Sequence, residues 1–172
     1  MRVDGRYAKT KADRQEMARG AYEWLLKAQE REGDEGKDRL LDELAVGAYE
    51  AGEMDAARLF AQRMLENVVD YWEPSIWIYE AHRILGHLAF DRGDFLQAAD
   101  CLALAGAGVT VFRFRRGPTL SLAQVFLEKG EREMVAEHLR TIRKVWSPGW
   151  EKVDGWLEQL ANGQQPNLID SK

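Results

Sequence analysis

Apolar side chains recur every three to four residues along most of this chain, which places them on one face of an α-helix. The first stripe, from Met17 to Ala28, predicts a helix over residues 8–32. Only residues 109–114, which are rich in β-branched and aromatic side chains, are expected to be extended. Because no segment has the pattern of a β-sheet, we predict an all-α protein.

Further stripes follow in pairs, and each pair is interrupted by a glycine within a polar turn. These pairs predict three helical hairpins, over residues 38–70, 75–107 and 117–146. A last stripe predicts a capping helix over residues 149–162, followed by a polar, irregular tail at 163–172. We therefore expect one domain of 172 residues with about eight antiparallel helices.

The three hairpins share small residues at matching distances from the turn glycine. The turn glycines are Gly52, Gly93 and Gly130, which are 93 − 52 = 41 and 130 − 93 = 37 residues apart. The residues seven positions before each glycine are Ala45, Gly86 and Ala123, and those five positions after it are Ala57, Ala98 and Val135. Small side chains at these positions allow two helices to approach closely, while larger apolar neighbours join one hairpin to the next.

This arrangement resembles the tetratricopeptide repeat family, whose period is about 34 residues. The resemblance covers residues 39–146 and is strongest in the middle hairpin. Consensus positions there are occupied by Leu85, Gly86, Ala89, Gly93, Phe95, Ala98, Leu102 and Ala105. The third hairpin departs from the pattern, with Arg132 where an aromatic residue is usual and Val135 where alanine is usual. The second half is also similar to a group of bacterial repeat proteins of unknown activity.

The resemblance implies a right-handed solenoid of helical hairpins whose terminal helices act as caps. A simple helical bundle is the alternative, although a bundle requires neither small residues at a fixed period nor repeated turn glycines. Members of the family usually hold a peptide or a partner helix in a concave groove, which the first helix of each hairpin lines. The resemblance therefore implies a non-catalytic module for protein–protein interaction.

The family's groove positions can be carried onto this chain by aligning the turn glycines. The resulting candidates for partner binding are Arg39, Asp42, Tyr49, Arg83, His87, Phe90, Gln124 and Leu127. Aromatic and apolar side chains stand here among charges of both signs, a mixture that suits an amphipathic peptide. Two alternatives stay open. The groove is filled by the first helix or by the tail, or it is an ordinary solvated face.

A cluster of arginines precedes the first helix of the third hairpin. Arg113, Arg115 and Arg116 stand just before Pro118, where that helix is expected to begin. Free N–H groups at a helix N-terminus, together with three guanidinium groups, would suit an anion or a carboxylate. In the alternative interpretation the arginines pair with surface carboxylates while the interleaved phenylalanines pack on the core.

Composition narrows the classes of partner. The formal net charge is −5 and the isoelectric point is near 5.3, which argues against general nucleic-acid binding. The first residues form no secretory signal and no window is apolar enough to span a membrane, so a cytoplasmic location without membrane contact is expected. The one cysteine, Cys101, lies in an apolar helical segment and is expected to be buried and inert.

The sequence contains no constellation that predicts chemistry. His82 and His87 are five residues apart on one predicted helix, too far around it to share a metal as residues at i and i+4 do. No nucleophile, phosphate-binding or dinucleotide-binding motif is present, so we expect no metal, no cofactor and no enzymatic activity.

Two other hypotheses accompany the binding module. The first is a regulatory or immunity-type protein that caps a partner enzyme, since an acidic surface would complement a basic target. The second is a small enzyme or ligand-binding helical domain, which would need a closed pocket with convergent polar groups that the sequence does not show. Separately, the aromatic segment 71–79 would mark a homodimer interface if exposed and core packing if buried.

Overall fold

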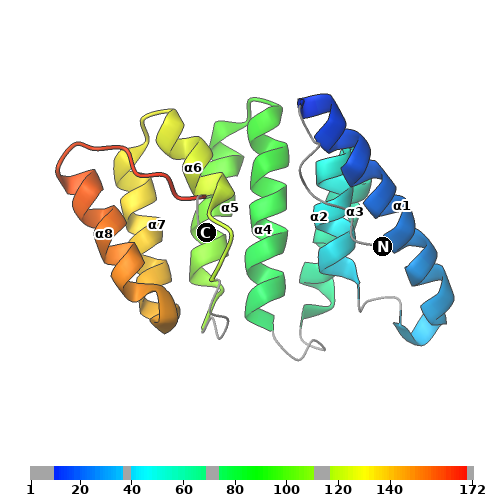
Figure 1. Cartoon of the computed structure of the whole chain (residues 1–172). Coiled ribbons are helices and arrows are strands. Elements are labelled where there is room, and N and C mark those ends of the chain that lie inside the picture. Colours follow the sequence, from blue (N-terminus) through cyan, green and yellow to red (C-terminus); the bar gives the residue numbers. More distant parts are fainter. Residues whose placement is uncertain (1–9, 37–39, 69–73, 111–116, 170–172) are drawn as a thin grey trace. The chain divides into compact units, whose positions relative to one another are not determined.

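The computed structural model describes residues 10–36, 40–68, 74–110 and 117–169. These residues contain eight α-helices and a short 3-10 helix, and no strand occurs among them, which confirms the all-α prediction for this part of the chain (Figure 1). The helices are α1 (Lys11–Gly36), α2 (Leu41–Ala51), α3 (Met54–Glu66), α4 (Pro74–Asp91), α5 (Phe95–Ala107), α6 (Ser121–Glu128), α7 (Arg132–Val145) and α8 (Trp150–Ala161), with the 3-10 helix η2 at Ser147–Gly149. Each predicted hairpin range contains two of them.

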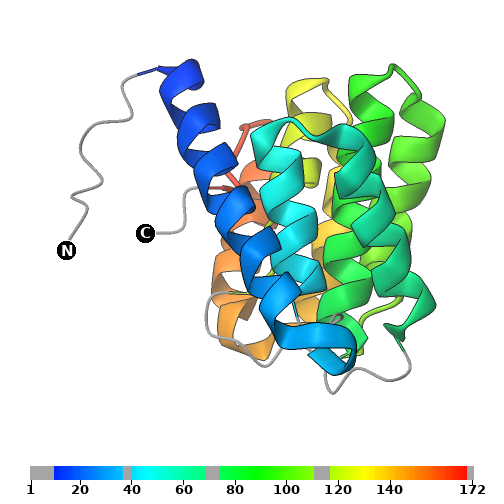
Figure 2. The same ribbon diagram turned by 90° about the vertical axis from the view of Figure 1, so that its right-hand side faces the viewer.

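The chain forms two compact units, which divide after Asn67. In the first unit α1 packs along α2, and α2 pairs with α3 (Figure 2). The second unit contains two hairpins, α4–α5 and α6–α7. Within it α4 contacts α6, α5 contacts α7, and α8 packs against α7. None of the described helices is both long enough and apolar enough to cross a membrane.

The three predicted turn glycines have the same backbone geometry. Their φ angles are +88° at Gly52, +80° at Gly93 and +91° at Gly130, in the left-handed region that only glycine adopts without strain. In each turn the glycine N–H bonds to the carbonyl three residues before it, and the next N–H bonds to the carbonyl five residues before that N–H. This pair of bonds is the Schellman motif, which ends one helix and redirects the chain into the next.

A fourth turn of the same kind ends α8. Gly163 has a φ of +77°, its N–H donates to the Leu160 carbonyl at 3.1 Å, and the Gln164 N–H donates to the Gln159 carbonyl at 2.9 Å. The chain therefore turns back after α8 as it does after α2, α4 and α6. It continues, however, as a non-helical segment at residues 164–169 instead of a second helix.

The small residues before the turns allow close helix contact, as expected. A Cβ built on Gly86 of α4 would lie 3.1 Å from the Cys101 Cβ of α5 and 2.3 Å from a methyl group of Leu122 in α6. No larger side chain fits there without displacing a neighbour. Cys101 is buried, as predicted, and burial raises the pKa of its thiol.

The core of the second unit is continuous from α4 to the C-terminal segment. Its fully buried members include Ala89, Leu122, Val135 and Val153. Leu168, beyond the last helix, belongs to the same cluster of buried side chains and is only 2% exposed. The segment that was predicted to be a polar tail thus contributes to the core.

Candidate functional site

The predicted groove residues of α4 and α6 lie close together but are mostly covered. Arg83 and His87 on α4 are 8% and 7% exposed, and Gln124 and Leu127 on α6 are 9% and 2% exposed. Residues four apart on a helix share a face, which explains how Arg83 and His87 reach the same neighbour on α6. That neighbour is Ser121, the first residue of α6.

Arg83 is held by an ion pair within its own helix. Its Nε donates to the Glu80 carboxylate at 2.7 Å, and a second guanidinium nitrogen lies 2.6 Å from the same oxygen. A third nitrogen donates to the Ser121 hydroxyl at 3.1 Å. Because the guanidinium charge is balanced by Glu80, this part of the face presents little net charge.

His87 shares the Ser121 hydroxyl with Arg83. The His87 Nε2 and the Ser121 Oγ are 2.8 Å apart. Burial, followed by the positive charge of Arg83, lowers the pKa of His87 to about 4. The imidazole is therefore neutral at pH 7, and its Nε2 can accept the serine proton while the serine oxygen accepts from Arg83.

A serine that is hydrogen-bonded to a histidine is also found in enzymes in which the histidine activates the serine as a nucleophile. Here the guanidinium of Arg83 occupies the same hydroxyl oxygen, and a histidine whose pKa is about 4 is a weak base. We therefore interpret the three side chains as a network that fixes α6 against α4.

Gln124 connects α6 to the C-terminal segment. Its side-chain oxygen accepts the backbone N–H of Leu168 at 2.9 Å, and its amide nitrogen donates to Glu128 at 3.1 Å. Burial alternates along the segment, since Pro166 and Leu168 are buried whereas Asn167 and Ile169 are exposed. The side of the segment that carries Pro166 and Leu168 is therefore covered by the rest of the unit.

Arg132, the first residue of α7, holds the start of this segment. One guanidinium nitrogen donates to the Leu160 carbonyl at the end of α8 at 3.2 Å, and it also donates to the Gln164 carbonyl. The segment is therefore held at Gln164 by Arg132 and at Leu168 by Gln124.

Phe90 lies in the last turn of α4. Its ring makes edge-to-face contacts with Phe95 and Phe126 at centroid distances of 5.0 and 5.5 Å. The Lys129 ammonium lies 5.9 Å from the centroids of both Phe90 and Phe95. Phe90 is half-buried, so it joins the hairpin turn to α6 and leaves part of its ring accessible.

The remaining groove candidates belong to the first unit. Asp42 and Tyr49 of α2 are half-buried, and Arg39 lies outside the described residues. One oxygen of Asp42 is buried and has no hydrogen-bond partner in the described chain. Burial, followed by the interaction with Glu43, raises the pKa of Asp42 to about 7.

The arginine cluster cannot be placed. Arg113, Arg115 and Arg116 lie outside the described residues, as does most of the segment that was expected to be extended. The anion-site prediction therefore stays a prediction.

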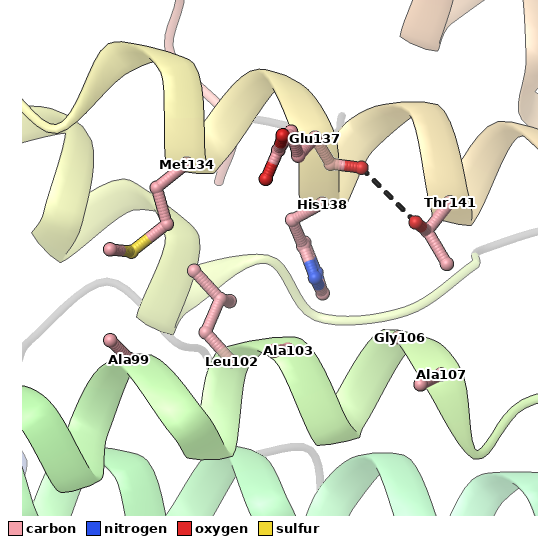
Figure 3. Close-up of a pocket in the computed structure, with 9 residues that line it drawn as sticks. All are labelled: Ala99, Leu102, Ala103, Gly106, Ala107, Met134, Glu137, His138 and Thr141. Carbon is pink, nitrogen blue, oxygen red and sulfur yellow. Dashed lines mark hydrogen bonds between the residues drawn. The ribbon is translucent and has the colours of Figure 1, made fainter.

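A separate cavity opens between α5 and α7. It has a volume of about 170 Å³ and is lined by Ala99, Leu102, Ala103, Gly106, Ala107, Met134, Glu137, His138 and Thr141 (Figure 3). The His138 ring lies between the two helices, and burial lowers its pKa to about 4 against a smaller raising effect of the Leu102 backbone. The Thr141 hydroxyl donates a hydrogen bond to the backbone carbonyl of Glu137 at 3.1 Å. The small side chains of α5 leave room here for one side chain of moderate size.

Three contacting residues escaped the sequence prediction: Ser121, Arg132 and Leu168. Arg132 had been noted only as a departure from the repeat consensus. The signal for Leu168 was weak but present, because a proline and two adjacent aliphatic residues interrupt an otherwise polar tail. No cluster of three or more histidine, cysteine or acidic side chains suitable for a metal ion occurs among residues 10–36, 40–68, 74–110 and 117–169.

Comparisons of the chain with protein-family models, with curated proteins and with solved structures gave no match.

Proposed function

We propose that this protein is a non-catalytic binding module that holds an extended peptide segment of a partner protein against α6 of its second unit. One observation carries the proposal: this face already holds a non-helical segment, through the bond from the Leu168 N–H to Gln124 and through a buried leucine. Recognition of extended chains commonly combines a main-chain hydrogen bond with pockets for alternate side chains. The alternation of buried and exposed residues at 166–169 has this form.

We further propose that the hairpins are repeats of the tetratricopeptide type. Support comes from the Schellman turns at Gly52, Gly93 and Gly130 and from the close contact at Gly86. In such an arrangement the first helices of successive hairpins, here α4 and α6, present one common surface. The candidates Arg83, His87, Phe90, Gln124 and Leu127 all belong to these two helices.

A peptide-display selection against the full chain tests the proposal. We expect the selected peptides to share an aliphatic residue, and their affinity can then be measured by fluorescence anisotropy. Replacing Gln124 by methionine preserves side-chain size but removes the acceptor for the peptide N–H. Loss of one such bond, worth about 1–1.5 kcal/mol, weakens the intrinsic affinity for the peptide about tenfold. Because the Leu168 N–H also bonds to Gln124, the substitution is compared in chains that carry Leu168→Ala, in which the protein's own segment competes less.

The matched control is Gln62→Met, at an exposed position of α3 in the other unit. This variant should bind the selected peptides as the wild type does. Selected peptides whose affinity for the Leu168→Ala chain is the same with and without Gln124→Met would refute the proposed site.

A further inference from the structure

We infer that residues 164–169 act as an intramolecular ligand that occupies the proposed peptide site until a partner segment of similar chemistry displaces them. This inference rests on the proposed function. It adds the identity of the occupant, the class of partner sequence and a competition that regulates binding.

The segment is positioned by a small number of contacts. Arg132 holds it at Gln164, and Gln124 holds it at the Leu168 N–H. Between these points Pro166 and Leu168 are buried, whereas Ile169 is 53% exposed. Because both polar contacts go to main-chain atoms, another chain can make them without sharing the sequence of the segment.

The partner's sequence is constrained by the buried side chains and by charge. Proline at one position and leucine two positions later are the buried residues of the intramolecular segment. The Arg83 guanidinium is paired with Glu80. The Gln124 amide donates to the Glu128 carboxylate, so an acidic ligand is disfavoured beside Gln124. The partner that fits is an extended, uncharged segment with an aliphatic residue and, two residues before it, a proline.

The Gly163 turn explains why this segment reaches α6. Turns of one type follow α4, α6 and α8. The first two fold α5 against α4 and α7 against α6, and the third, at Gly163, directs residues 164–169 back along the unit from the end of α8 (Figure 1). A tethered segment has an effective concentration in the millimolar range, so even weak docking competes with a peptide in solution. Release of the segment therefore raises the apparent affinity for a partner.

The test compares Leu168→Ala with Ile169→Ala in the full chain. The two positions are adjacent, but Leu168 is 2% exposed and Ile169 is 53% exposed. If the segment is docked about nine-tenths of the time, apparent affinity for a peptide selected as described above is reduced about tenfold. We expect Leu168→Ala to bind that peptide about tenfold more tightly than the wild type, and Ile169→Ala to bind it as the wild type does.

A second measurement needs no variant of the protein. A synthetic peptide with the sequence of residues 163–169 should displace the labelled selected peptide from the wild-type chain. The same peptide with alanine in place of its leucine should not. This competition decides the question even if the Leu168→Ala chain does not fold.

The outcomes separate this inference from the proposed function. Peptides that bind through Gln124 with equal affinity for the wild type and Leu168→Ala, and that the 163–169 peptide does not displace, would overturn the inference alone. Selection of no peptide that depends on Gln124 would overturn the proposed function. Wild-type dimers that dissociate on Leu168→Ala substitution in sedimentation experiments would assign the segment to a second copy and contradict the intramolecular form.

Discussion

At the scale of single residues, three glycines of the second unit have different physical roles. Gly86 lies where a Cβ would meet the Cβ of Cys101 at 3.1 Å. Gly93 has open space around it but a φ of +80°. Gly155 lies within α8 with open space and no positive φ. The same substitution therefore has a different cost at each position.

We predict that Gly86→Ala lowers the free energy of unfolding by about 1–3 kcal/mol through overpacking. Gly93→Ala should lower it by about 1–2 kcal/mol through left-handed backbone strain. Gly155→Ala should raise it by about 0.5–1 kcal/mol because alanine favours the helix. Urea denaturation of the three variants measures these changes, and a Gly86→Ala variant as stable as the wild type would disprove the close contact.

Asp42 makes the first unit sensitive to pH. Its pKa of about 7 in the folded chain is above the ordinary value of 3.8, so the folded state favours the neutral carboxyl. Stability from this group is present below about pH 4 and is lost as the pH rises through about 7.

We therefore expect Asp42→Asn to stabilise the protein at pH 8 by roughly 1–2 kcal/mol, allowing for the partial exposure of the side chain, and to have a much smaller effect at pH 4. Denaturation at the two pH values measures the difference. Glu50→Gln, at an exposed position of the same helix, is the control, and an equal response of both variants would contradict the assigned burial of Asp42.

At the scale of elements, the helices were predictable and the C-terminal segment was not. Apolar residues at helical spacing, with Gly52, Gly93 and Gly130 between them, contain most of the information needed to place three hairpins. Leu168 carries no such periodicity, since one aliphatic side chain in a polar tail contributes little to any window. Its burial depends on the Gly163 turn and on Arg132, contacts that form only after α7 and α8 have packed.

The same reasoning applies to the candidate site. Helices α4 and α6 bring Arg83 and His87 together with Ser121, a residue that the sequence pattern did not single out. Sequence alone did not reveal that Arg83 and His87 are buried. Helical periodicity predicts which residues share a face of a helix. It does not predict which other segments cover that face, and these segments determine how exposed the side chains are.

Arg132 should be important for the end of α8. We predict that Arg132→Met, which keeps the aliphatic part of the side chain, lowers the free energy of unfolding by about 1–3 kcal/mol because the carbonyl groups of Leu160 and Gln164 lose a charged donor. Arg140→Met is the control on the same helix. Its exposed ion pair with Glu133 should contribute less than about 1 kcal/mol. Equal losses in the two variants would argue against a specific role of Arg132.

At the scale of the whole molecule, the stability of the second unit is expected to fall as the pH falls, in contrast to the contribution of Asp42 in the first unit. Burial lowers the pKa values of His87 and His138 to about 4, and that of His82 is lowered as well. The unfolded chain binds protons at these groups from about pH 6.5 downward. Stability from the neutral histidines is therefore complete above pH 6.5 and is lost as the pH falls toward 4.

We predict that acidification from pH 7 to pH 4.5 destabilises the second unit by about 1–3 kcal/mol for each strongly shifted histidine. Trp77, Trp146 and Trp156 are buried in this unit, so tryptophan fluorescence follows its unfolding. His138→Gln should reduce the pH dependence. A midpoint that does not change between pH 7 and pH 4.5 would contradict the burial of these imidazoles.

The central claim is that the α6 face of the second unit holds an extended chain segment, either the protein's own or a partner's. Hydrogen exchange of the Leu168 amide in the wild-type chain tests it most directly, because that amide bonds to Gln124 at 2.9 Å. We expect the amide to be protected in the free protein and to lose this protection when a selected peptide is present at saturating concentration. An amide that exchanges freely without peptide, or that stays equally protected with peptide bound, would contradict it.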